Sequence, residues 1–333
     1  MASCFSFHFH ISSCLMRGNL LQYEKITSIM SADTASLGAF SMYLDMFGHK
    51  RCKVGLHTHT TRSDGKFTPE SAAAVYKAAG YDAIAITDHW KYHDRDEISG
   101  LKIISGCEYN HGSSNTIGDV MHIVGVGMQT DPCIDRATAS RQDIINAIHD
   151  KGGLAILAHP AWSLNTPQDA LVLSGFDGVE IYNTVSNVGQ SSRPYSGYFV
   201  DLLANMGTAY PLIAADDTHC YEGVDDCKAW IMARCDDDSV DAILDSIRRG
   251  DYYATQGPEV HVRREGDKII ADCTPCATID FLSNSAWVPD KMTRGKELTR
   301  AEYQIKAWEK WVRVEVCDDQ GRFAWSSVIM ITD

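Results

Sequence analysis

The chain has 333 residues, of which 44% are hydrophobic and 22% are charged, the composition of an ordinary globular enzyme with one large domain or two unequal ones. Its formal charge of −14 argues against a broad attraction to nucleic-acid phosphates, because that attraction comes from clustered lysines and arginines. A small anionic substrate stays compatible with this charge, since bound metal ions reverse the local field.

Residues 1–50 show weak periodicity and several internal methionines. We interpret them as an extension, either a start codon placed too early or a disordered segment. They do not have the form of a signal peptide, because His8 and His10 interrupt the apolar residues. No apolar run reaches the roughly 18 residues of a membrane span. The 11 cysteines lack the spacing of a disulfide framework, so we expect a cytoplasmic protein without a membrane partner.

From Arg51 onward, short apolar runs alternate with helical patterns, which is typical of βα units and a parallel sheet. The predicted strands span residues 52–56, 83–87, 102–105, 120–126, 154–157, 178–182 and 211–214. The predicted helices span residues 68–79, 140–150, 198–205 and 239–249. The first is the best marked, because Thr68 can cap it, Pro69 suits the first helical position and Gly80 ends it. Residues 51–257 are therefore predicted to form an α/β domain.

After Pro258 the sequence changes to β-type runs at residues 268–271, 278–282, 312–316 and 328–331, without matching helices. We therefore predict that residues 258–333 form a small, all-β, sandwich-like module. Cys273 and Cys276 lie in this region without a second pair, so we interpret them as plain strand cysteines.

Side chains suited to metal binding follow or lie in nearly every predicted strand of the α/β domain. His57 and His59 end the first strand, and their spacing of two places both on one face of an extended chain. The full set is His57, His59, Asp64, His89, Glu108, His122, His159, Asp217 and His219. Any one of these histidines alone would more often be an ordinary core or surface residue. The joint pattern favours a metal centre, because the carboxyl ends of barrel strands converge on one mouth.

Imidazole mixed with carboxylate suits Zn, Mn or Fe, and the set exceeds the needs of one four-coordinate ion, so we expect two or three divalent ions. Asp88 is expected to orient His89 or a neighbouring ligand, and Asp216 is interpreted as a solvated neighbour. Residues that could contact a substrate phosphate, although each could equally be a plain surface residue, are Arg62, Lys66, Lys91, His93 and Arg193. The polar segment 183–195 is expected to shape the pocket.

These motifs, in their order along the chain, resemble the PHP (polymerase and histidinol phosphatase) domain superfamily of metal-dependent phosphoesterases. The matching motifs are His57-Thr58-His59, Ser63-Asp64-Gly65, Thr87-Asp88-His89, Gly106-Cys107-Glu108, Ala158-His159-Pro160 and Asp217-Thr218-His219. The resemblance covers about residues 53–257. It implies a distorted, TIM-like (β/α)7 barrel with a trinuclear site.

The resemblance also implies how the ligands divide among three ions. The first ion would be held by His57, His59, Glu108 and Asp217. The second would share Glu108 with His122 and His159, and the third would be held by Asp64, His89 and His219. Many members carry a histidine where this chain has Asp64, which leaves the affinity of the third site open.

The leading functional hypothesis is hydrolysis of a small phosphate ester through a metal-bound hydroxide. The same site could hydrolyse a carboxylic or carbamic ester, or act as an exonuclease on short oligonucleotides. A catalytically silent PHP scaffold or sensor is the non-enzymatic alternative. A fold by itself does not select among these functions.

Overall fold

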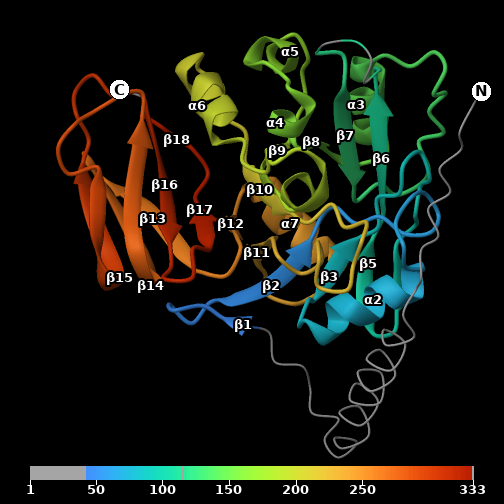
Figure 1. Ribbon diagram of the computed structural model, residues 1–333, viewed down its shortest axis with the longest axis horizontal. Coiled ribbons are helices and arrows are strands. Elements are labelled where there is room, and N and C mark those ends of the chain that lie inside the picture. Colours follow the sequence, from blue (N-terminus) through green and yellow to red (C-terminus); the bar gives the residue numbers. More distant parts are fainter. Residues whose placement is uncertain (1–42, 114–115, 117, 332–333) are drawn as a thin grey trace, which may run out of the picture. The chain divides into compact units, whose positions relative to one another are not determined.

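The computed structural model describes residues 43–113, 116 and 118–331 (Figure 1). Residues Met42–Asp333 form one compact unit. Most of the predicted extension lies outside the described residues. Residues 43–50, the part of the extension that is described, belong to the folded unit, because Tyr43–Leu44 (β1) pairs antiparallel with Lys50–Gly55 (β2).

The strands form two sheets. The larger sheet has 13 strands. Ten of them follow one another as hydrogen-bonded neighbours. Their order is β13 (Val260–Glu265), β14 (Lys268–Ser283), β16 (Trp311–Cys317), β17 (Phe323–Trp325), β12 (Tyr252–Thr255), β11 (Trp230–Arg234), β2, β3 (Ala83–Ala85), β5 (Leu101–Ile104) and β4 (Asp96–Ile98). Off this path, β1 pairs with β2, β15 (Met292–Gln304) with β14, and β18 (Ile329–Met330) with β16. The smaller sheet has the order β10 (Leu212–Ala215), β9 (Gly178–Asn183), β8 (Leu154–Leu157), β7 (Met121–Val126) and β6 (Gly106–His111).

Both sheets are mixed, so the prediction of a parallel sheet is only partly right. β2, β3 and β5 are parallel, as are β8, β9 and β10. β6, β7 and β8 are antiparallel neighbours, and β11 runs antiparallel to β2. Glu108 lies inside β6, a strand that the sequence analysis did not predict. The apolar runs did not reveal strand direction, because an antiparallel pair needs no crossover helix.

The two sheets do not close into a single barrel within the described residues, so the expected distorted (β/α)7 barrel is not found there as one closed sheet. They meet at two isolated parallel bridges, Thr58↔Thr218 and His89↔Glu108. Each bridge lies beside predicted metal ligands. The ends of the strands that carry these ligands are therefore the places where the sheets come together.

The four predicted helices agree with α2 (Pro69–Ala78), α3 (Arg141–Asp150), α6 (Gly197–Asn205) and α7 (Val240–Arg249). Thr68, Ser140 and Ser239 cap three of them by accepting a backbone N–H bond in the first turn. The shorter α4 (Pro160–Ser163), α5 (Pro167–Leu171) and the π-helix η1 (Ser186–Gln190) were not predicted. In the described part of the chain, no helix is both long and apolar enough to cross a membrane.

The C-terminal region is built from strands, but its sheet continues the larger sheet of the preceding region. The predicted runs 268–271 and 278–282 are parts of one long strand, β14, whose pairing with β15 shifts register around Cys276. β17 pairs with β12, and Trp325 of β17 is buried among side chains of the smaller sheet. The final strands thereby reach the core beside the candidate site.

Candidate metal centre

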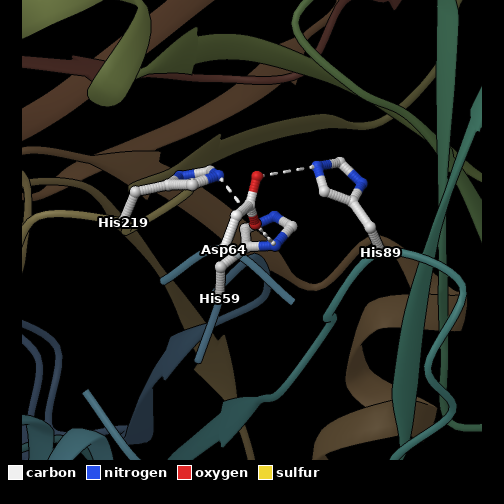
Figure 2. A group of neighbouring side chains, drawn as sticks. All are labelled: His59, Asp64, His89 and His219. Carbon is white, nitrogen blue, oxygen red and sulfur yellow. Dashed lines mark ion pairs between the residues drawn. The ribbon is translucent and has the colours of Figure 1, made fainter. Parts of the chain in front are cut away.

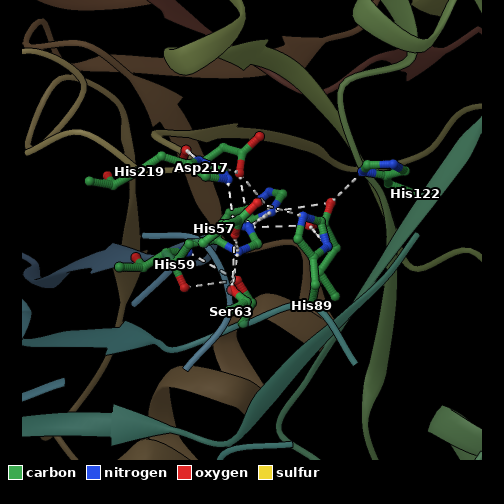
Figure 3. A network of polar contacts seen from close by, with 12 residues as sticks. His57, His59, Ser63, His89, His122, Asp217 and His219 are labelled. Carbon is green, nitrogen blue, oxygen red and sulfur yellow. Dashed lines mark hydrogen bonds and ion pairs between the residues drawn. The ribbon is translucent and has the colours of Figure 1, made fainter. Parts of the chain in front are cut away.

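All nine side chains predicted as metal ligands lie together in the structure, and Figure 3 shows six of them, His57, His59, His89, His122, Asp217 and His219, close to one another. They form three groups in which the possible ligand atoms lie within 4.8 Å of one another. The groups are His57, His59, Glu108 and Asp217; Glu108, His122 and His159; and His59, Asp64, His89 and His219. Glu108 belongs to two groups, and so does His59, which the sequence analysis assigned to only one. The groups thus form one connected cluster.

The first group is fully buried. The Nε2 atom of His57 lies 3.1 Å from Oδ1 of Asp217, and the Nε2 atom of His59 lies 3.1 Å from the same oxygen. The two Nε2 atoms are 3.2 Å apart. His59 Nε2 is also 3.1 Å from Oε2 of Glu108. Nitrogen and oxygen lone pairs therefore converge on one small volume.

The second group extends from the other oxygen of Glu108. Oε1 lies 2.9 Å from Nδ1 of His122 and 3.4 Å from Nε2 of His159. Oε1 also lies 3.4 Å from Nε2 of His57, so the Glu108 carboxylate as a whole lies between the first two groups, as a bridging carboxylate would.

The third group surrounds Asp64 (Figure 2). Its carboxylate oxygens lie 3.7 Å from His89 Nε2, 3.5 Å from His219 Nε2 and 3.5 Å from His59 Nδ1. The Asp64 side chain is 54% exposed, whereas those of Glu108 and Asp217 are at most 7% exposed. This group faces solvent, and the first does not.

The buried polar atoms of the cluster fit a bound cation. Glu108 Oε2, Asp217 Oδ1 and His89 Nδ1 are buried and form no well-aligned hydrogen bond among the described residues, although His89 Nδ1 lies 3.0 Å from Glu108 Oε2. A buried polar atom without a partner costs roughly 1–3 kcal/mol. Three such atoms in one cluster, two of them carboxylate oxygens faced by imidazole nitrogens, are accounted for by positive charge placed between them.

The electrostatics keep the carboxylates ionised. Burial alone would raise the pKa of Glu108, but charge on His57, His122 and His89 holds it well below its usual value. The pKa of Asp217 is likewise well below its usual value, because His57 and His59 outweigh the effect of burial. In return, burial would lower the pKa of His57, but Asp217 and Glu108 raise it.

Glu180 is a buried carboxylate of the site that the sequence analysis missed. Its Oε1 lies 2.7 Å from Nδ1 of His57, and its Oε2 accepts from the backbone N of His159 at 2.9 Å. The side chain of Asn183 donates to Oε2 of Glu180 at 2.9 Å and to Oδ2 of Asp217 at 3.2 Å. A usable signal was present, since a glutamate stands in the middle of the otherwise apolar run of β9.

Asp88 orients the loop that follows His59. Its Oδ1 accepts from the hydroxyl of Ser63 at 2.6 Å, and Oδ1 and Oδ2 accept from the backbone and hydroxyl of Thr60. Ser63 Oγ lies 3.3 Å from Nδ1 of His59. Through Thr60 and Ser63, Asp88 thus helps to position His59, the ligand that follows β2.

Asp216 is not the solvated neighbour that the sequence suggested. It is buried, and it accepts hydrogen bonds from the hydroxyls of Tyr76 and Thr184. Burial raises its pKa to about 7. The side chain points away from water because Tyr76 and Thr184 hold it in the protein interior.

A pocket of about 170 Å³ opens at the cluster. It is lined by Asp64, His89, Glu108, His122, His159, Trp162, Gln190, Asp217 and His219. None of the five predicted substrate contacts is among its lining residues. Lys66, Lys91 and Arg193 are exposed, and the Arg62 guanidinium lies 2.7 Å from Nδ1 of His93.

Trp162 and Gln190 are the lining residues that the sequence analysis did not single out. Trp162 lies on α4, directly after His159, and its ring centroid is 4.9 Å from that of His159 and 5.4 Å from that of His122. Gln190 falls within the segment that was expected to shape the pocket.

The chain is similar in sequence to known proteins. The model of the PHP domain family matches residues 55–219, a range that includes every candidate ligand. Uncharacterized protein MJ1587 of Methanocaldococcus jannaschii is 31% identical over 151 residues, which cover 41% of this chain and 85% of that protein.

Two solved structures extend the comparison. A two-domain protein of Bacteroides vulgatus, containing a predicted PHP-like metal-dependent phosphoesterase, matches with a TM-score of 0.50 and 15% identity. This match covers 88% of this chain and 99% of that chain, so the two proteins are similar in fold over most of this chain. The lesion-specific endonuclease of Pyrococcus furiosus has a TM-score of 0.43 and 13% identity, over 60% of this chain and 56% of that one.

Proposed function

The chain belongs to the PHP domain family, and from that premise we propose that it is a metal-dependent hydrolase that cleaves a small phosphate ester. The observation that carries the proposal is the position of Glu108. This buried carboxylate faces imidazoles of two groups, and its Oε2 lies 3.1 Å from His59 Nε2 and 3.0 Å from His89 Nδ1 without a well-aligned hydrogen bond to either. A carboxylate placed in this way can hold two ions close together.

The three groups would hold two or three divalent ions, of Mn, Zn or Fe, with the ligands assigned above. Bound there, such ions supply positive charge for the phosphoryl oxygens and lower the pKa of a water molecule. The first two groups are the stronger candidates, because they are buried and their ligands are held in place. The third is the weaker candidate, because the Asp64 side chain is half-exposed.

The protein's own residues prepare the site. Glu180 accepts from Nδ1 of His57, which leaves the Nε2 lone pair free to face Asp217. Asn183 fixes Oδ2 of Asp217 through its side-chain amide. Trp162 packs against the His122 ring and edge-on against the His159 ring.

The arrangement of the sheets supports a further part of the proposal, that the seven strands expected from the sequence, β2, β3, β5 and β7 to β10, act together as a distorted barrel. The bridges Thr58↔Thr218 and His89↔Glu108 join the two sheets on either side of the cluster.

The composition of the pocket wall means that an anionic substrate would have to be held by bound metal rather than by arginine or lysine. The lining residues include no lysine or arginine, and three of them are carboxylates. An anion could enter such a site only if bound ions reversed its charge. The same ions would also attack a carbonyl group, so a carboxylic or carbamic ester is the alternative substrate.

The test is an assay of metal-free and metal-loaded protein with three substrates: p-nitrophenyl phosphate, p-nitrophenyl acetate and a short RNA. We expect the phosphate to turn over only after Mn or Zn is added, and His159→Ala to abolish turnover while the folded structure is kept. The matched control is His149→Ala, which removes a surface histidine paired with Asp177.

Turnover of the acetate alone would refute the phosphoesterase proposal in favour of the carbonyl alternative. Cleavage of the RNA alone would favour the exonuclease. A protein that binds metal but cleaves none of the three would favour a silent scaffold or sensor.

A further inference from the structure

The two pocket-lining residues outside the candidate ligand set depend on one stretch of chain, residues 183–196, here called the pocket segment. Gln190 ends the π-helix η1 inside this segment. Trp162 lies on α4, and the backbone N of its neighbour Ala161 donates to the hydroxyl of Ser196 at 3.2 Å. The part of the pocket wall that is free to recognise a substrate is therefore attached to the pocket segment.

The N-terminal end of the pocket segment is fixed by the candidate metal centre. Asn183 donates to Oδ2 of Asp217 at 3.2 Å and to Glu180 at 2.9 Å. The hydroxyl of Ser186, the first residue of η1, donates to Oδ1 of Asn183 at 2.8 Å. This end can move only if the ligand cluster moves.

The C-terminal end is fixed by the C-terminal strands. The hydroxyl of Tyr195 donates to the carboxylate of Glu315 on β16, and it accepts from Nη2 of Arg313 at 3.2 Å. The Tyr195 ring is stacked on Trp325 of β17, with a centroid distance of 6.4 Å and an interplanar angle of 26°. One side chain thus joins two C-terminal strands to the pocket segment.

The two ends of the pocket segment are joined to each other at Tyr195. Tyr195 forms an isolated bridge with Tyr182, and the backbone N of Asn183 donates to the carbonyl of Pro194 at 2.9 Å. The backbone N of Ser196 donates to the carbonyl of Ile181 at 2.9 Å. A displacement of Tyr195 would therefore move both ends of the loop that carries η1.

The partners of Tyr195 are much more firmly placed than the segment itself. Arg313 is fully buried, and its Nε donates to Asp201 of α6 at 2.6 Å. Trp325 is 1% exposed, whereas Tyr195 is 41% exposed and Val188 is 43% exposed. The C-terminal strands are the rigid side of this contact, and the pocket segment is the side that needs support.

We propose that Tyr195 is a positioning residue through which β16 and β17 hold the pocket segment, and with it Gln190 and Trp162, against the candidate metal centre. The C-terminal strands would then set how well a substrate fits the pocket, while the ligand cluster carries out the chemistry. The effect on substrate binding rests on the proposed function, but the mechanical coupling does not.

The coupling is tested by hydrogen–deuterium exchange on the full chain. Tyr195→Phe removes the hydroxyl bonds and keeps the ring on Trp325. We expect the backbone amides of residues 186–193 to exchange about tenfold faster, the scale set by a lost bond to a charged group. Tyr198→Phe, the same change at a tyrosine that is 76% exposed three residues away, should leave exchange unchanged.

Glu315→Gln provides a second test of the coupling, because it weakens the hydrogen bond between Tyr195 and Glu315 by changing the acceptor instead of the donor. If neither Tyr195→Phe nor Glu315→Gln speeds exchange in residues 186–193, the coupling is refuted, whether or not the protein hydrolyses any ester. If exchange rises equally throughout the chain, the two residues support the whole fold, and the positioning role is likewise refuted.

Kinetics then test the consequence for the substrate, with whichever ester the metal-loaded protein hydrolyses. Tyr195→Phe should raise KM about fivefold and leave kcat within about twofold, because the candidate ligands are untouched. Gln190→Ala should raise KM similarly, and the double variant should lose less than the sum of the two single losses, because part of the effect of Tyr195→Phe passes through Gln190. Additive losses, or a loss in kcat alone, would overturn the claim that Tyr195 acts through the pocket segment.

Discussion

Glu180 connects two of the candidate ligand groups: its Oε1 lies 2.7 Å from Nδ1 of His57, and its Oε2 accepts from the backbone N of His159 at 2.9 Å. With Nδ1–H donated to Glu180, the His57 ring presents its Nε2 lone pair to the first group. The same carboxylate fixes the backbone at His159, which has a positive φ of 28°. One buried side chain therefore orients ligands on two different strands.

Glu180→Gln is expected to weaken metal binding by roughly 10-fold to 100-fold, as losses of such supporting carboxylates generally do. The amide can donate to Nδ1 of His57 and so allow the wrong tautomer, with a proton on Nε2. Competition with a chromophoric chelator measures the affinity. The exposed Glu97 offers a matched control, and Glu97→Gln should bind metal normally. An affinity equal to that of the wild type in Glu180→Gln would mean that Glu180 only fills space.

Asp64 and Glu108 are expected to differ sharply when each loses its charge. Glu108 is 1% exposed and belongs to two groups, whereas the Asp64 side chain is 54% exposed and belongs to one. Asp64→Asn should therefore reduce the bound metal by about one ion, and Glu108→Gln should remove nearly all of it. Elemental analysis after dialysis gives the stoichiometry. The reverse order of losses would contradict the proposed division of ligands.

The candidate ligands could be predicted because their signal is local: each is a metal-compatible side chain at or near the end of an apolar run. The residues that hold the ligands and the pocket in place were harder to predict. Glu180 looks like any charged residue in a strand until the fold places it beside His57, and Tyr195 gains its role only when β16 arrives from 120 residues away. Strand direction was missed for a similar reason, since an apolar run such as that of β7 does not show whether its neighbour is antiparallel.

Glu259 is expected to contribute acid-sensitive stability. Burial by itself would raise its pKa, but hydrogen bonds from His261, Tyr43 and the backbone of Met46 lower it below the ordinary value of 4.5. A lowered folded pKa stabilises the protein above the unfolded value, and this stabilisation is lost as pH falls through the folded pKa. Glu259→Gln should therefore destabilise the protein at pH 7, by an amount that shrinks below about pH 4.5.

Urea unfolding of the wild type and of Glu259→Gln, from pH 7 to pH 3, measures this difference. Glu265→Gln is a suitable control, because Glu265 is an exposed glutamate at the end of the same strand, β13. A difference between the wild type and Glu259→Gln that stays constant across this range would show that the charge on Glu259 is not what stabilises the fold.

The residues just before β2 are expected to be part of the stable unit. Asp45 is 4% exposed and accepts from Nε of Arg51 at 2.8 Å, and Arg51 is 6% exposed. Removing Asp45 would leave a buried guanidinium without its carboxylate, a change that costs roughly 3–5 kcal/mol. A chain that starts at Gly48 should be less stable by about this amount than one that starts at Met42, and Asp45→Asn in the longer chain should reproduce most of the loss. Urea unfolding of the three proteins at pH 7 decides the point, and equal midpoints would place these residues outside the folded unit.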